Sequence, residues 1–127
     1  MDRRQFVAAC AGLAAAGCGR RDARVVLYCA QDREFAEAIL TDFEKESGLH
    51  VDAKYDTEAQ KTVGLASELE VEAGRPRADV FWNNEPINTI RLNRLGVLDP
   101  YESPGAAGFP DWTRPADKSW QAFAARA

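Results

Sequence analysis

The sequence is poor in the residues that build enzyme and metal centres. Among 127 residues there is one histidine, His50, and there are three cysteines, none of them in a CxxC pair. We expect Cys10 and Cys18 to belong to an N-terminal export segment, so that Cys29 is the only thiol of the folded part. These counts exclude an internal disulfide framework and a CxxC zinc site. With a single histidine at the start of an expected strand, no Ser-His-Asp set can be assembled either.

The net charge of the chain is also small. The formal net charge is −4, with 46% hydrophobic and 28% charged residues. This composition is typical of one globular domain and excludes a basic arm for nucleic acids. Neither GxGxxG nor GxxxxGK[ST] occurs, so neither kind of nucleotide-binding fold is supported.

The first residues have the pattern of an export signal. Arg3 and Arg4 precede an apolar stretch from Phe6 to Ala16, which small residues follow. The arginine pair is typical of the twin-arginine type, and residues 15–18 (AAGC) resemble a lipobox. We therefore predict a signal at 1–17, lipidation of Cys18 and a linker at 18–24. The alternative is a buried N-terminal helix. A membrane-spanning helix is not expected, because the stretch is far shorter than the ~20 residues that span a membrane.

From Arg24 the sequence alternates between strand and helix patterns. Short apolar or alternating runs predict strands at 24–30, 49–55 and 79–82. Each is followed by apolar residues at helical spacing and a closing glycine: Gly48, Gly74 or Gly96. The order β-α-β-α-β-α predicts an α/β fold, a parallel sheet with helices on both faces.

The helix starts carry capping signals. Asp32 and Glu85 are the predicted N-caps of the first and third helices, and Pro86 suits the first helical position. Thr57 and Gln60 form a predicted capping box on the second helix. The face of the first helix that we expect to be buried comprises Phe35, Ala36, Ile39, Leu40 and Phe43.

The sequence after Leu98 has another character. Residues 103–118 are rich in glycine and proline and predict a loop. Residues 120–127 are apolar again and end without a cap, which leads us to expect a fragment of a longer protein.

Polar residues follow every predicted strand. Since the carboxyl ends of parallel strands lie along one edge, Asp32, Thr57, Asn84 and Glu85 should line a shared crevice there. They are the candidate ligand-binding residues. The alternative reading is that each only caps a helix, because caps favour the same residue types. Carboxylates without a base, a metal-ligand histidine or a phosphate loop favour ligand capture over catalysis, so we do not expect an enzyme.

Four stretches together resemble the extracellular solute-binding proteins of ABC importers, and most of all the periplasmic ferric-ion-binding group. They are VVLYCAQDREFAEAIL, FEKESGLHVDAKYDTEAQKTVGL, PRADVFWNNEPINTIRL and GVLDPYESP. The resemblance extends from about Val25 to Ala127. SWQAFAARA is similar to the segment that enters the first crossover strand between the two lobes of that family.

The resemblance implies that 25–127 is the incomplete first lobe of a two-lobed, type II periplasmic-binding-protein fold. Such proteins close on Fe(III), the transported ligand, and deliver it to an ABC permease in the inner membrane. Asp32 stands where ferric-binding relatives often have a histidine, and Glu85 matches the family's glutamate, so both are the candidate metal ligands. The family's iron-binding tyrosines lie in the second lobe and crossover region, beyond Ala127.

We accordingly expect a periplasmic or extracytoplasmic monomer without a catalytic cofactor, attached to the membrane only through a lipid on Cys18. Relatives that bind polyamines, thiamine or phosphonates leave the ligand open. A flavodoxin-like α/β enzyme domain that uses the same edge is the alternative of another class.

Overall fold

Three parallel strands form the sheet of the computed structural model, which describes residues 23–56 and 63–124. The strands are β1 (Arg24–Cys29), β2 (His50–Tyr55) and β3 (Val80–Trp82), in the order β2-β1-β3. Both neighbours of β1 run parallel to it, with Cys29 opposite Tyr55 on one side and Trp82 on the other. The predicted parallel sheet is therefore confirmed.

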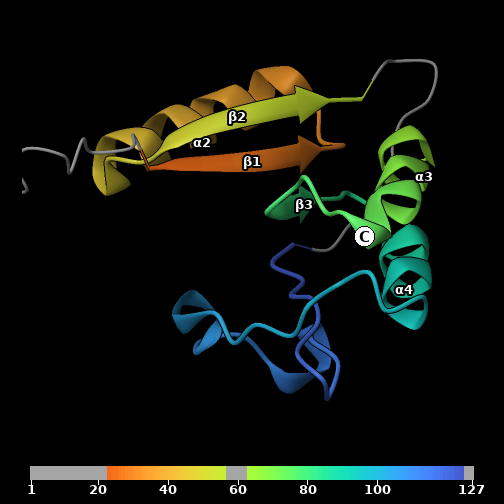
Figure 1. The fold of residues 1–127 in the computed structure, drawn as a ribbon. Helices are drawn as coiled ribbons and strands as arrows, with labels where there is room; N and C mark the ends of the chain where they lie inside the picture. Colours follow the sequence, from red (N-terminus) through yellow and green to blue (C-terminus); the bar gives the residue numbers. More distant parts are fainter. Residues whose placement is uncertain (1–22, 57–62, 125–127) are drawn as a thin grey trace, which may run out of the picture.

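Three α-helices alternate with the strands, as predicted. They are α2 (Arg33–Ser47), α3 (Val63–Val71) and α4 (Pro86–Arg94). The tighter 3₁₀ turn η1 (Glu72–Gly74) continues α3. Figure 1 shows α2 running along β1 and β2, with α3 and α4 stacked beyond the strand ends.

The two faces of the sheet carry different elements. Leu27 and Cys29 of β1 form a core cluster with Ala36 of α2. Tyr28 points to the opposite face, where its hydroxyl group donates a hydrogen bond of 3.0 Å to Glu72 of η1. Since successive strand residues alternate between faces, α2 covers one face and the α3–η1 segment the other. Leu27, Tyr28 and Cys29 are consequently all buried.

The expected buried face of α2 is wrong in part. Ala36 is fully buried and Leu40 packs against the core, but Phe35 is 59% and Ile39 56% exposed, and Phe43 is also exposed. Adjacent strands lie ~4.8 Å apart, so three strands are only about as wide as one helix of ~10 Å diameter. A sheet this narrow covers one side of the apolar arc of α2, at Ala36 and Leu40, and leaves the other side with Phe35 and Ile39 exposed.

Residues 99–124 lie beyond the helices and have no strand or α-helix. They contain the short 3₁₀ turns η2 (Pro104–Ala106) and η3 (Asp111–Thr113), in agreement with the predicted loop. The segment that resembles the entry to a crossover strand, residues 119–127, forms no strand up to Ala124. It returns to the sheet, where Phe123 packs against Trp82 with ring centroids 6.0 Å apart.

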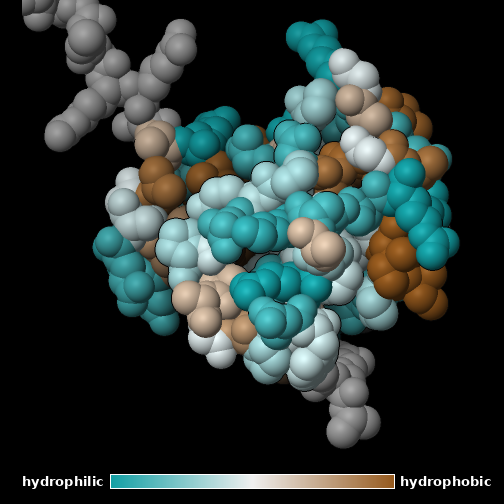
Figure 2. Space-filling view, turned by 90° about the horizontal axis from the view of Figure 1, so that it is seen from below, coloured by the Kyte–Doolittle hydropathy of each residue, from teal (hydrophilic) through white to brown (hydrophobic). Residues whose placement is uncertain are grey.

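The surface seen from below is polar at its centre (Figure 2). Hydrophobic side chains gather at its right margin, on the side where α3 and α4 lie in Figure 1. The exposed apolar residues of these helices and their ends are Val71, Ile87, Ile90 and Leu95.

The predicted export signal, the lipidation of Cys18 and most of the linker at 18–24 lie outside the described residues. Within 23–56 and 63–124, no helix is long and apolar enough to cross a membrane.

Candidate functional site

The crevice that the sequence predicts lies where the connections of the sheet diverge. The chain leaves β1 over one face through α2 and reaches β3 over the other face through α3. The strand order reverses between the adjacent strands β1 and β3, and this position is the switch point of the sheet. In open parallel sheets, ligands bind outside the strand ends at the switch point. The ends of β1 and β3 are joined by a hydrogen bond of 2.8 Å from the Ala30 amide to the Trp82 carbonyl oxygen. The chain thus leaves the sheet toward Asp32 and toward Glu85 from neighbouring positions.

Asn83 organises the turn between β3 and α4. Its Oδ1 accepts hydrogen bonds from the amides of Asn84 (2.8 Å) and Glu85 (3.3 Å). Its Nδ2 donates to the Glu85 carbonyl oxygen, to Glu85 Oε1 at 3.1 Å and to Thr89 Oγ1 at 2.9 Å. Local hydrogen bonding of this kind is what makes Asn a turn residue. The polar side chains after β3 therefore form hydrogen bonds with one another and with the backbone of the turn.

Glu85 is the N-cap of α4, as predicted, and it caps with its side chain. Its carboxylate accepts from the Ile87 amide at 2.7 Å and from the Asn88 amide at 3.2 Å. Partial burial opposes ionisation, but the hydrogen bonds from Asn83, Asn88 and Ile87 outweigh it and lower the pKa of Glu85. The side chain is consequently held as an anion at the positive end of the helix dipole.

Asp32 is also an N-cap by position, but not by its side chain. Its carbonyl oxygen accepts from the amides of Phe35 and Ala36, both at 3.1 Å, whereas its carboxylate makes no cap hydrogen bond. The predicted side-chain cap is wrong here. The backbone of Asp32, with φ −57° and ψ 127°, turns the chain from β1 into α2.

The remaining predicted ligand-binding residues are Asn84 and Thr57. Asn84 is exposed in the turn that Asn83 organises. Thr57 and the predicted capping box with Gln60 lie outside the described residues. Asp56 follows β2, which is the strand on the far side of β1, and its Oδ2 accepts from the Leu65 amide of α3 at 3.3 Å. The ends of β1 and β3 are thus neighbours, and on the other side of β1 the Asp56 amide donates to the Cys29 carbonyl oxygen at 3.3 Å.

Asn83 is the residue that sequence reasoning did not select. It follows the same strand as Asn84 and Glu85, which are the residues that the sequence analysis predicts to bind the ligand there. The signal that identifies it is its position two residues before a helix N-cap, from which an Asn side chain can accept from the following amides.

Cys29 lies directly below this edge, between Tyr55 and Trp82 in the sheet. It is 0% exposed and belongs to the core cluster, and burial raises the pKa of its thiol. A buried, protonated thiol is a packing group and a poor nucleophile. This confirms that Cys29 acts as a small hydrophobic residue.

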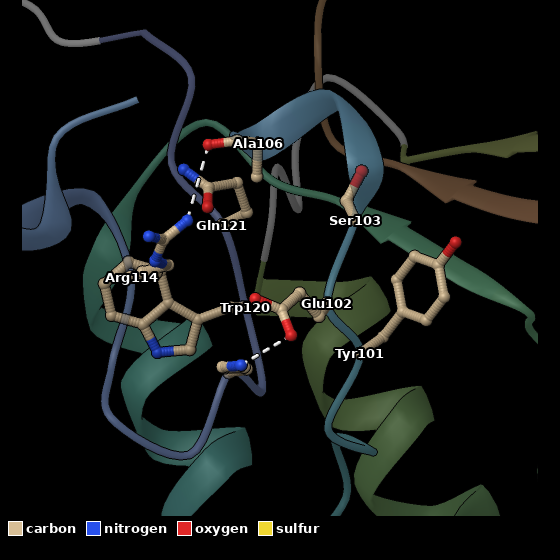
Figure 3. A pocket seen from close by; sticks show the side chains of 8 residues that line it. Tyr101, Glu102, Ser103, Ala106, Arg114, Trp120 and Gln121 are labelled. Carbon is tan, nitrogen blue, oxygen red and sulfur yellow. Dashed lines mark hydrogen bonds and ion pairs between the residues drawn. The ribbon is translucent and has the colours of Figure 1, made fainter. Parts of the chain in front are cut away.

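The loop after α4 encloses a pocket of about 10 Å³, room for about one water molecule. Its lining contains an ion pair of 2.6 Å between Lys118 and Glu102 and a hydrogen bond from Arg114 to the Ala106 carbonyl oxygen (Figure 3). Within 23–56 and 63–124, no group of three or more His, Cys, Asp or Glu side chains could hold a metal ion. Any cation bound at the edge would need further ligands from elsewhere.

Several solved structures are similar to this chain, and some of them contain a bound ligand. Iron-bound HitA from Pseudomonas aeruginosa is 26% identical, with a TM-score of 0.65 over 76% of this chain and 30% of HitA. FutA (IdiA) of Trichodesmium, in complex with iron and citrate, is 24% identical, with a TM-score of 0.67 over 79% of this chain and 31% of FutA. The periplasmic binding protein AfuA from Actinobacillus pleuropneumoniae, with fructose-6-phosphate bound, is 23% identical, with a TM-score of 0.57 over 65% of this chain and 24% of AfuA. No family model matches the sequence.

The comparisons establish the fold. The sheet and its helices match part of the periplasmic-binding-protein fold, and ferric-binding proteins are among the structural neighbours. The chain spans under a third of the length of these neighbours.

Proposed function

We propose that this chain is the first-lobe portion of a solute-binding protein of an ABC importer, and that it captures Fe(III) at the edge formed by the ends of β1 and β3. The observation that carries the proposal is the hydrogen bond between Ala30 and Trp82, which makes the connections toward Asp32 and Glu85 leave from neighbouring positions in a fold shared with iron-bound HitA. Carboxylate oxygens are hard donors, which suit a hard trivalent cation.

Glu85 is held through both oxygens of its carboxylate. An ionised carboxylate has about four acceptor directions. Oε1 accepts from Asn83 Nδ2 and the Asn88 amide, and Oε2 accepts from the amides of Ile87 and Asn88. A cation bound by Glu85 would therefore displace one of these donors, with Asp32 as the second ligand from this lobe.

The same contacts favour a cation over an oxyanion. An oxyanion at the start of α4 would need the amides of Ile87 and Asn88, which already donate to Glu85. Arg33, next to Asp32, is paired with Glu37 at 2.6 Å and lies over the ring of Tyr55 at 5.0 Å. The basic group beside the edge is thus already engaged.

The rest of the proposed machinery lies outside this chain. Two carboxylates do not complete a coordination sphere, so a second lobe would supply the remaining ligands, with tyrosines as the expected type. Iron would then pass to a permease in the inner membrane. The signal at 1–17 and a lipid on Cys18 would keep the protein at the outer surface of that membrane.

The test is a titration of the chain with Fe(III) against a competing chelator, for the parent, Asp32→Asn and Glu85→Gln. Both substitutions remove a charge and keep the size, and Glu85→Gln keeps a capping oxygen. Neighbours of a metal ligand already contribute about ten- to a hundredfold to affinity, so loss of a ligand should weaken binding by at least about tenfold. Glu46→Gln, exposed near the end of α2, is the matched control. Equal affinity for all four proteins would show that neither carboxylate is a ligand of the ion.

A second candidate is capture of a phosphorylated sugar, which the structure of AfuA with fructose-6-phosphate favours. The same titration with fructose-6-phosphate and no metal separates the two functions. Binding of the sugar phosphate by a protein indifferent to Fe(III) would replace the iron proposal, and polyamine, thiamine and phosphonate ligands can be tested in the same way.

A further inference from the structure

Two helices each expose an apolar face that carries a charge. On α2, Phe35, Ile39 and Phe43 follow one another at intervals of four residues, and all three are exposed. Residues at this spacing lie on one side of a helix. Glu46, seven residues after Ile39, is exposed on the same side. We call Phe35, Ile39, Phe43 and Glu46 the acidic face.

The corresponding face of α4 is basic. Ile87 is 75% and Ile90 38% exposed, and the exposed Arg94 follows them at helical spacing, so the three side chains lie on one side of the helix. Leu92 is fully buried on the inward side. The helix lies on the side of the molecule where hydrophobic side chains gather in Figure 2. We call Ile87, Ile90 and Arg94 the basic face.

The charges on the two faces are opposite, and neither is neutralised. Within residues 23–56 and 63–124, neither Glu46 nor Arg94 forms an ion pair. The other charged side chains beside the faces do form ion pairs, namely Asp42 with Lys45 and Arg91 with Glu70. Contact between two acidic faces or between two basic faces would bring like charges together, which disfavours association. Contact between an acidic and a basic face brings opposite charges together.

We propose that the acidic face of one copy of this chain packs on the basic face of a second copy. Exposed apolar surface with a polar rim marks interaction sites, and the opposite charges identify the partner, because the chain itself supplies both halves of the contact. Since α2 lies along the sheet and α4 beyond the strand ends (Figure 1), one copy can use its two faces for different neighbours. The contacts then run head to tail, in place of the monomer expected from the sequence. The proposal does not depend on which ligand the protein binds.

Charge reversal tests the contact without changing the core, because both charged side chains are exposed. Glu46→Lys and Arg94→Glu each place like charges across the contact, and each should raise the dissociation constant by at least about tenfold. A protein with both substitutions, and an equal mixture of the two single variants, should associate to within about threefold of the parent, because opposite charges meet again in every contact. Glu34→Lys makes the same charge change on another side of α2 and is the matched control. It should leave the dissociation constant within about twofold of the parent value.

Sedimentation equilibrium of the full chain at several concentrations gives these dissociation constants, under reducing conditions so that the cysteines do not cross-link. The mean mass of the parent should rise with concentration above the 14.0 kDa of one chain. A parent that keeps the mass of one chain at every concentration would overturn the proposal. Association that neither reversal weakens, or that the combined reversal does not restore, would also overturn it, because the contact would then lie on another surface.

Discussion

The hydroxyl group of Tyr28 donates a hydrogen bond of 3.0 Å to the carboxylate of Glu72, 44 residues later in the chain. It joins the central strand to η1, and Arg77 lies on the other side of Glu72 at 3.6 Å. Lys54 lies over the ring of Tyr28 at 5.1 Å. The face of the sheet opposite α2 is therefore closed by a polar contact built around one buried phenol.

This contact predicts an alkaline loss of stability. Burial and the hydrogen bond to Glu72 raise the pKa of Tyr28 to about 12, from an ordinary 10.0. Between these values the unfolded chain has lost the proton that the folded chain keeps, so the free energy of unfolding falls as the pH rises. The contribution of Tyr28 is complete below about pH 10 and is lost by about pH 12.

Denaturant unfolding at several pH values checks this prediction. The parent should lose more stability between pH 10 and 12 than Tyr28→Phe, which has no proton to lose. Tyr101→Phe serves as the control, because Tyr101 is exposed. Parallel curves for the parent and Tyr28→Phe would contradict the assignment.

The cap of α4 predicts a stability cost for changes at Glu85. Glu85→Ala removes the acceptor for the amides of Ile87 and Asn88 and should lower the free energy of unfolding by about 1 kcal/mol. Glu85→Gln should cost less, since its side-chain oxygen still accepts. Urea unfolding near neutral pH gives both values, and an unchanged midpoint for Glu85→Ala would show that the side-chain cap is not formed in solution.

The uneven burial of the apolar residues predicts that substitutions are costly at Leu92 and tolerated at Phe35. Leu92 of α4 is fully buried, and Leu92→Ala should cost about 2–5 kcal/mol through lost contacts and a cavity. Phe35→Ser on α2 should change the free energy of unfolding by no more than about 0.5 kcal/mol, as for other exposed sites. A large cost at Phe35 would mean that another part of the polypeptide covers the exposed edge of α2.

The buried thiol predicts slow modification. In a variant with Cys10 and Cys18 replaced by serine, alkylation of Cys29 should require unfolding, because the thiol is inaccessible and burial raises its pKa. The rate in native buffer should be slower than in urea by orders of magnitude and should follow the unfolding equilibrium. Equal rates in both solvents would place Cys29 at the surface.

Much of the fold could be predicted from local patterns. The continuous apolar run of β1 indicated a strand buried on both sides, and Leu27, Tyr28 and Cys29 are buried. Gly48 was expected to end α2, and it adopts the left-handed conformation with φ 70°. Pro86 and Glu85 marked the start of α4 correctly. These features depend on neighbours in sequence, so the sequence carries them directly.

The candidate site was predictable only as a location. Parallel strands imply that the residues after them share an edge, and the strand ends that lead to Asp32 and Glu85 are indeed neighbours. The sequence also predicted the same capping role for both, whereas only Glu85 caps with its side chain. The difference arises from the backbone turn and from Asn83, which a pattern of residue types does not describe.

The sequence by itself determined the order of strands and helices, the ends of α2 and α4 and the absence of a histidine- or cysteine-based centre, because these follow from composition and from contacts within a few residues. Only the tertiary structure decided that β1 lies between β2 and β3, and that Asn83 holds Glu85 while Phe35 and Ile39 remain exposed. Strand order and the width of the sheet depend on pairings between segments more than twenty residues apart, such as Cys29 with Tyr55 and Trp82. The free energy of such pairings depends on many side chains from separate segments, so it cannot be predicted from any single stretch of sequence.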